Sequence, residues 1–172
     1  VFNLNDDQKI KEAVTEHYKK YNKGICLRVA RSDLADTTIL YKKIETLLKD
    51  FNLFRKNIDL LIDIKSFREN GGQYLQFMNA AQRIENLSEW RSFIIASGAF
   101  PQNLTKCKLD EPNFLPRFDW QNWLQYGKEK GLVRSPTFAD YTIRNPIFDE
   151  TSQYLNSTPS IKYTLDKDWL IL

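Results

Sequence analysis

The sequence predicts an α/β protein with mostly parallel strands and covering helices. Segments with strand character are centred at Leu27, Leu61, Ile94, Asp140 and Tyr163, and their spacings are 34, 33, 46 and 23 residues. Helical patterns separate most of these segments, which is the spacing of repeated strand–helix–strand units. Parallel neighbours need such long crossover connections. The interval pattern and the intervening helices together predict the fold class.

The predicted elements follow in chain order from local signals. Apolar periodicity and capping residues predict four helices. The first covers residues 5–22, and the second is capped by Ser32 and Asp33 and has an apolar stripe of Leu40, Ile44, Leu47 and Leu48. The third follows Gly71 and Gly72, and the fourth is capped by Asp119 and ends at Gly131. Apolar and β-branched runs predict the strands: Gly24–Arg31, Ile58–Phe67, Arg91–Phe100, Thr137–Arg144, and a strand with a final hairpin or edge strand within Ser160–Leu172.

Two architectures fit these elements, a partial (β/α)-barrel and an open α/β sheet. A strand buried on both faces is apolar almost throughout. In Ile58–Lys65, however, every second residue is apolar, and the alternate positions include Asp63 and Lys65. One helix-covered face and one charged face favours the partial barrel. A complete barrel takes roughly 250 residues, so this chain would supply only its later strands.

The charged positions of the predicted strands indicate where a functional site lies. Placed on a common inside, they are Arg28, Asp63, Lys65, Asp140 and Lys162. The carboxyl ends of parallel strands carry the active sites of such folds. Asp63 and Asp140 are the candidate catalytic pair for acid–base work, and the three cations are candidate binders of an anion. The alternative is a structural ionic core with Arg28–Asp63 and Asp140–Lys162 pairs. Both interpretations remain open here.

Composition excludes several chemistries. The chain has 172 residues, two cysteines and one histidine. Cys26, Cys107 and His17 are too few and too scattered for a zinc site, and His17 lies on a predicted solvated helix. No nucleotide-binding glycine motif occurs, and no cofactor is predicted. A carboxylate pair such as Asp63 and Asp140 could hold a divalent metal through oxygen, but no metal is assigned. The absence of a long apolar run predicts no membrane span, and sparse cysteine usage favours the cytoplasm.

A nucleic acid is a permitted partner. The formal net charge is +3 at pH 7, and the charges are interspersed rather than gathered in blocks. Trp120 and Trp123 beside Arg117 offer rings for base stacking. At helical spacing, such rings more often pack against the rest of the fold, and this packing role is favoured.

Several segments together resemble a known family: LLIDIKSF, FIIASGAFPQNL, LPRFDWQNW, ADYTIRNPIFDE and SIKYTLDKDWLIL. They are similar to the carboxyl-terminal half of the beta protein family of phages and bacteria, which is largely uncharacterised. The resemblance covers most of residues 24–172 and implies a link to phage–host conflict, and hence to antiphage defence. It transfers no catalytic residues. Its motifs include Asp140 and Tyr141, and Lys162, Tyr163 and Thr164, so Tyr141 and Tyr163 join the candidate ligand-binding residues.

These observations predict one domain over residues 1–172, with a helix in 1–23 and β/α units in 24–172. Because Val1 is not an initiator methionine, and because a half barrel leaves strand edges open, we expect a partner. That partner is a missing amino-terminal half, another subunit or a second copy. The first functional hypothesis is a binding or sensing module for a protein or nucleic acid in phage–host conflict. The second is a barrel enzyme acting on a phosphate-bearing substrate.

Overall fold

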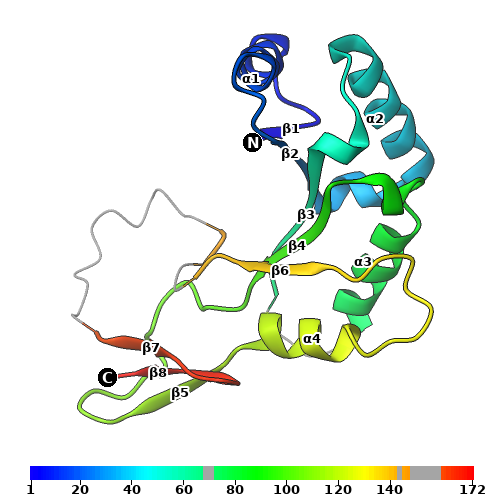
Figure 1. The fold of residues 1–172 in the computed structure, drawn as a ribbon. Helices are drawn as coiled ribbons and strands as arrows, with labels where there is room; N and C mark the ends of the chain where they lie inside the picture. Colours follow the sequence, from blue (N-terminus) through cyan, green and yellow to red (C-terminus); the bar gives the residue numbers. More distant parts are fainter. Residues whose placement is uncertain (68–71, 143–144, 148–159) are drawn as a thin grey trace.

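The computed structural model describes residues 1–67, 72–142, 145–147 and 160–172. It is a mixed α/β fold with a five-stranded sheet and a separate three-stranded sheet (Figure 1). All neighbours in the larger sheet are parallel. In spatial order its strands are β1 (Phe2–Asn3), β2 (Ile25–Ala30), β3 (Ile58–Ser66), β4 (Ser92–Gly98) and β6 (Thr137–Asp140). The predicted α/β class with mostly parallel strands is confirmed.

The helices connect the parallel strands. They are α1 (Gln8–Tyr21), α2 (Thr37–Phe51), α3 (Gly72–Gln82) and α4 (Phe118–Tyr126), with the 3-10 helices η1 (Arg31–Ala35), η2 (Arg55–Asn57) and η3 (Leu87–Glu89). Each new parallel strand is added on the same side of the previous one. Right-handed crossovers then place the helices on one face of the sheet. The opposite face is called the open face below.

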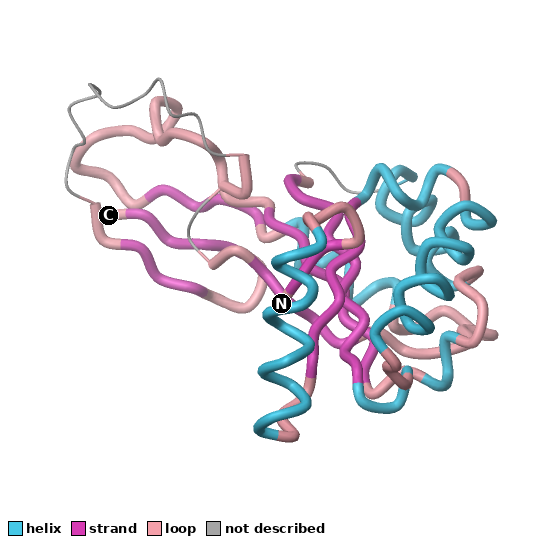
Figure 2. Tube along the Cα trace, turned by 90° about the horizontal axis from the view of Figure 1, so that it is seen from above, coloured by secondary structure: helices cyan, strands magenta, loops and turns pink. Residues whose placement is uncertain are grey.

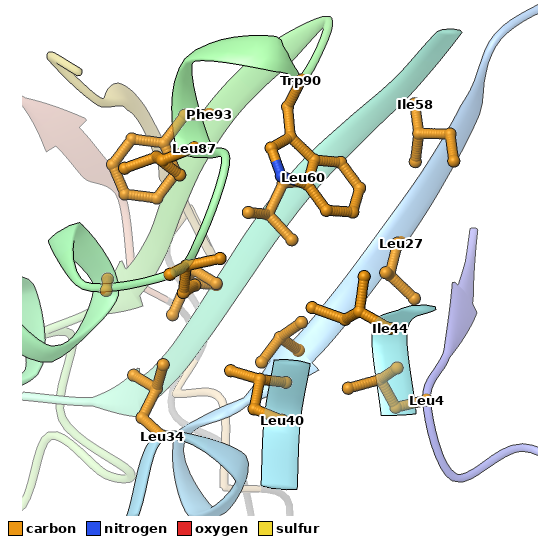
Figure 3. Close-up of a cluster of buried hydrophobic side chains, with 14 of the residues drawn as sticks. Leu4, Leu27, Leu34, Leu40, Ile44, Ile58, Leu60, Leu87, Trp90 and Phe93 are labelled. Carbon is orange, nitrogen blue, oxygen red and sulfur yellow. The ribbon is translucent and has the colours of Figure 1, made fainter. Parts of the chain in front are cut away.

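The main core lies between the sheet and these helices. Alternate side chains of β2 and β3, such as Leu27 and Leu60, point into it and are buried. Figure 3 shows Leu27 beside Ile44 of α2 and Leu60 beside Trp90, within a cluster that also includes Leu40. Burying one such side chain contributes about 1.5–3 kcal/mol. The apolar alternation seen in the sequence therefore fixes which face of each strand the helices cover.

The sheet has the strand order of a barrel without its closure. A barrel also has sequential parallel strands, so the strand order alone does not distinguish it from an open sheet. Among the described residues, however, the strands do not close on themselves, which is the open-sheet alternative. The prediction that residues 1–23 form only a helix missed β1. Phe2 pairs with Leu27 across a bridge of two residues, too short to produce a strand pattern.

The predicted cap of α2 was wrong. Ser32 and Asp33 do not cap α2, because they lie in η1, where Asp33 accepts the Ala30 amide at 3.0 Å. The cap of α2 is Asp36, which accepts the Thr38 and Ile39 amides, each at 2.9 Å. Asp33 and Asp36 both precede backbone amides that an aspartate can cap, so the sequence alone does not show which of the two caps α2.

Helix α4 is also shorter than predicted, and Asp119 is not its cap. Asp119 lies in the first turn and is buried. The helix ends at Tyr126, because the Gly127 amide closes the last turn on the Trp123 carbonyl at 2.9 Å. The predicted end at Gly131 therefore lies five residues too far along the chain.

The smaller sheet is antiparallel. Its strands are β5 (Asn113–Pro116), β8 (Asp168–Ile171) and β7 (Lys162–Thr164) in spatial order. The predicted carboxyl-terminal hairpin is present, but a fifth parallel strand at Tyr163 was wrong. Only residues 165–167 separate β7 from β8, and so short a link permits only antiparallel pairing. Strand β5 lies in a stretch for which the sequence predicts no strand.

Candidate functional site

Arg28 and Asp63 meet on the open face, towards the carboxyl ends of β2 and β3. Arg28 pairs with Leu61, and Ala30 pairs with Asp63, so Arg28 lies diagonally across from the carboxylate. Arg28 Nε donates to Asp63 Oδ2 at 2.8 Å, and its Nη2 donates to the same oxygen. Asp63 is 1% exposed, whereas the Arg28 side chain is 31% exposed. The carboxylate is therefore an anchor beneath a cation that solvent reaches.

A break in the strand register brings Lys65 to the same carboxylate. The β3–β4 ladder shifts between Asp63 and Lys65, and Lys65 takes a left-handed backbone conformation with φ 61°. Its amide donates to Asp63 Oδ1 at 2.9 Å, and its Nζ lies 3.5 Å from Asp63 Oδ2. Bulges commonly re-aim a side chain in this way. Here the bulge places a second, 44% exposed cation beside Arg28.

Tyr141 completes what we call the carboxyl-end cluster: Arg28, Asp63, Lys65 and Tyr141. Arg28 Nη2 lies 3.2 Å from the Tyr141 hydroxyl oxygen, and the Lys65 ammonium lies 5.8 Å from the centre of the Tyr141 ring. Tyr141 directly follows β6, so the cluster joins residues of β2 and β3 to the residue after β6. It joins residues that are far apart in the sequence.

Gly98 makes room for the tyrosine. A Cβ at Gly98 would lie 3.3 Å from Tyr141 Cδ2 and 3.1 Å from Pro146 Cδ. The Gly98 carbonyl also accepts the Phe67 amide at 2.7 Å. In the sequence, the SGAFP segment suggests either an anion-binding turn or a simple turn. The described contacts give Gly98 a packing role beside Tyr141.

The cluster keeps Asp63 ionised. Burial opposes ionisation of the carboxyl group, but hydrogen bonds from Tyr141, Arg28 and the Lys65 amide outweigh that penalty, so the pKa of Asp63 is lowered. Burial of Tyr141, together with its hydrogen bond to Asp63, raises the pKa of the phenol. Burial lowers the pKa of Arg28, but the hydrogen bond to Asp63 more than offsets this, and the pKa is raised. At neutral pH the cluster therefore holds two cations, one carboxylate and a neutral phenol.

The structure does not bring Asp140 to this cluster. Ala96 pairs with both Asp63 and Ala139, so Ala139 is the β6 residue in the same row as Asp63. Asp140 is the next residue and points to the helix-covered side, where its charge raises the pKa of Asp119 on α4. The expectation that Asp63 and Asp140 share a face was wrong, because the β6 residue in the row of Asp63 is Ala139, one position before Asp140. A catalytic role for Asp140 stays a prediction.

Lys162 and Tyr163 lie in the smaller sheet. Lys162 Nζ is 5.1 Å from the centre of the Phe100 ring, just beyond β4, and Tyr163 is exposed on the opposite face of β7. The Asp140–Lys162 pair considered from the sequence is not among the ion pairs of the described residues. Ligand-binding roles for Lys162 and Tyr163 are likewise still predictions.

Trp120 and Trp123 pack within the fold. Their rings stack at 5.0 Å, and both contact Phe138 of β6. Neither ring is exposed. The packing role favoured from the sequence therefore agrees with these contacts.

Sequence reasoning missed Asn145. Its side-chain amide donates to the Phe100 carbonyl at 2.7 Å and to Ser66 Oγ at 3.4 Å, so it joins the ends of β3 and β4 beside the cluster. The Asn-Pro pair at 145–146 is a turn signal that follows a strand, and it marks this position in the sequence.

In the comparison with known protein families, a model described as Beta protein matches residues 1–172. The chain belongs to the Beta protein family. Neither the curated proteins nor the solved structures give a match. Family membership assigns no activity to this Beta protein, so the case for its site rests on the carboxyl-end cluster. The match also includes residues 1–23, which the motif resemblance did not cover.

The described residues contain no group of three or more His, Cys, Asp or Glu side chains able to hold a metal ion. No helix in the described ranges is long and apolar enough to cross a membrane.

Proposed function

We propose that this Beta protein binds a phosphate-bearing ligand on the open face, with Arg28 and Lys65 as the cationic donors. The observation that carries this proposal is the pair of partly exposed cations fixed on one buried carboxylate. Arginine and lysine in a fixed arrangement are the usual partners of phosphate oxygens. Asp63 positions both groups, which lowers the entropic cost of forming the site.

The charges at the cluster also favour an anion. The ionised groups Arg28, Lys65 and Asp63 sum to one positive charge. The Tyr141 phenol stays protonated, so its oxygen adds no negative charge. A partly buried positive site strengthens the attraction of an anion relative to one in bulk water.

The same contacts give less support to catalysis by Asp63. A general base needs a pKa near the working pH and a free lone pair directed at its substrate. The pKa of Asp63 is lowered, and its oxygens already accept from Arg28 and the Lys65 amide. An enzyme acting on a phosphate-bearing substrate therefore remains the second hypothesis, with Asp63 as a positioning residue.

The wider setting is proposed on sequence grounds. Resemblance to phage and bacterial proteins supports a component of phage–host conflict that senses or binds a partner. Two free cysteines, Cys26 and Cys107, agree with a cytoplasmic location. A nucleic acid partner supplies the same phosphate chemistry as a free nucleotide, so both belong in the test.

The test is equilibrium binding of three probes at constant ionic strength: pyrophosphate, adenosine monophosphate and a single-stranded oligonucleotide. The informative variant is Lys65→Gln, because Arg28 still satisfies Asp63 in it. Lys43→Gln is the matched control. Like Lys65, Lys43 pairs with an aspartate: its Nζ lies 3.9 Å from Asp33 Oδ1. Its side chain is 46% exposed, which is similar to the 44% of Lys65.

We expect at least one probe to bind the wild-type chain and Lys65→Gln to weaken it by about tenfold, the worth of one charge-assisted hydrogen bond. Lys43→Gln leaves the affinity unchanged. Binding of the small probes indicates a nucleotide-like ligand, whereas binding of the oligonucleotide alone indicates a nucleic acid. Failure of all three, or equal losses in the two variants, overturns the proposal.

A further inference from the structure

One face of the smaller sheet is an exposed apolar surface. Figure 2 shows this sheet extending away from the helices. Phe114, Leu170 and Tyr163 form one cross-strand row, because Leu170 pairs with each of the other two. The residues on either side of Leu170, namely Trp169 and Ile171, are buried on the opposite face. Strand alternation therefore places the whole row on the outside.

The row belongs to a larger patch, which we call the outer face. Its members are apolar and, apart from the half-buried Leu170, between 40% and 60% exposed: Phe114, Ile161, Tyr163, Leu165, Leu170 and Leu172. Ile161 and Leu172 exchange two backbone hydrogen bonds of 2.9 Å, which extends the β7–β8 ladder beneath the patch. Single exposed apolar residues are ordinary, but a contiguous patch on adjoining strands marks an interaction surface.

The outer face has almost no charge. Asp168 is the one carboxylate among the strand residues on it, at the end of the patch next to the β7–β8 turn, and none of those strand residues is a lysine or an arginine. A nucleic acid or an acidic partner has nothing to pair with there. Interfaces between identical subunits are the more apolar class, and a flat apolar strand face packs well on another such face.

We propose that the outer face binds a second copy of this chain, with a two-fold axis along β8. In that arrangement Leu170 meets Leu170 of the second copy, and the aromatic rings on either side, Phe114 and Tyr163, meet each other twice. A two-fold axis requires one patch to complement itself. An aromatic residue in register on each side of Leu170 meets that requirement.

The area suits a weak dimer. An aromatic side chain buries about 150–250 Å² and an aliphatic one less, so half of that for six residues gives at most roughly 450–750 Å² per copy. The total of roughly 900–1,500 Å² reaches only the lower part of the range for specific interfaces. The same axis brings the two Asp168 carboxylates to one end of the interface, and their repulsion reduces the affinity further. We therefore expect association in the micromolar range.

Sedimentation equilibrium from about 10 to 300 µM tests this proposal. The wild-type average mass is expected to rise from 20.3 kDa towards twice that value with concentration. Phe114→Lys and Tyr163→Lys, on different strands, should each shift the dissociation constant at least about tenfold. Val133→Lys is the control, because Val133 is exposed and lies outside the patch. Far-ultraviolet circular dichroism confirms that each variant is folded.

Asp168→Asn tests the axis itself. Removal of the two facing carboxylates is expected to tighten association severalfold. A wild-type chain that stays at 20.3 kDa throughout overturns the proposal. So does a dimer that both lysine variants leave intact, or one that Asp168→Asn leaves unchanged.

Discussion

Arg28 and Asp63 lie diagonally across neighbouring parallel strands, and Arg28 Nε donates to Asp63 Oδ2 at 2.8 Å. The contact joins a buried anion to a cation that solvent reaches. A comparable pair, Arg91 and Asp59, lies near the amino ends of β3 and β4, with Arg91 Nε 2.8 Å from Asp59 Oδ1. Asp59 is more exposed than Asp63. The two pairs provide an internal comparison between a buried anchor and a surface ion pair.

Asp63→Asn is expected to lower the free energy of unfolding by about 3 kcal/mol, the cost of breaking a buried pair. The matched change Asp59→Asn should cost about 1 kcal/mol or less, because its pair is exposed. Urea unfolding at neutral pH measures both. Equal losses in the two variants would mean that Asp63 is not an anchor.

The stability that Asp63 contributes depends on pH in a definite direction. Because its folded pKa lies below the ordinary value of 3.8, the contribution is complete well above pH 3.8. It is lost as the pH falls from about 5 through the folded pKa. The difference in unfolding free energy between wild type and Asp63→Asn should shrink over that window. A difference that stays constant from pH 7 to pH 2 contradicts the assigned pKa direction.

Asp119 should behave in the opposite way. Burial raises the pKa of Asp119. This effect outweighs two that lower the pKa: the Trp120 amide, which donates to Asp119 Oδ1 at 2.8 Å, and the charge of Arg117. A raised carboxyl pKa means that stability is lost as the pH rises above 3.8 through the folded pKa. Asp119→Asn removes that loss, so the variant should gain stability relative to wild type between pH 4 and pH 7. Thermal unfolding at the two pH values checks the sign, and a relative loss contradicts it.

The backbone at Lys65 predicts an unusual ranking of variants. Its φ of 61° strains any residue with a Cβ. Lys65→Gly should therefore be more stable than Lys65→Ala by about 1 kcal/mol, after allowing for the freedom that glycine adds to the unfolded chain. Both lack the ammonium and should lose anion affinity equally. If chemical denaturation finds the alanine variant equally stable, Lys65 is not strained.

Gly98→Ala tests whether the absence of a side chain at Gly98 is needed for the packing of Tyr141. The new Cβ would crowd Tyr141 and Pro146, so we expect a loss of about 1–3 kcal/mol in unfolding free energy and weaker anion binding. Gly127→Ala is the control, because its Cβ meets only an ordinary contact, the Trp123 carbonyl at 3.5 Å, and its φ is −61°. That variant should be neutral or slightly stabilised. Similar losses in both would remove the special role of Gly98.

The sequence was most informative where period-two alternation is long. Ile58–Lys65 separated a helix-facing side from a charged side, and Arg28 and Asp63 do lie together on the latter. A phase error moved Asp140 to the wrong face, because four residues of β6 do not reveal their register with β3. Register depends on neighbouring strands, which a single segment does not encode.

Other features depend on contacts across the fold. No glycine or proline within Ile58–Phe67 indicates the bulge at Lys65. β1 consists of only two residues, and β5 lies within a stretch rich in polar residues. Tyr141 was chosen through a family motif, and its hydrogen bond to Arg28 spans 113 positions of the sequence. Tertiary pairing, rather than propensity, determines each of these features.

The most direct test of the anion site is a nuclear magnetic resonance titration that follows arginine side-chain Nε–H signals as inorganic phosphate is added at fixed ionic strength. The proposed function predicts a saturable shift at Arg28 that Lys65→Gln weakens, with no such shift at Arg91. A shift at Arg91 equal to that at Arg28, or no saturable shift at Arg28 at all, would contradict it.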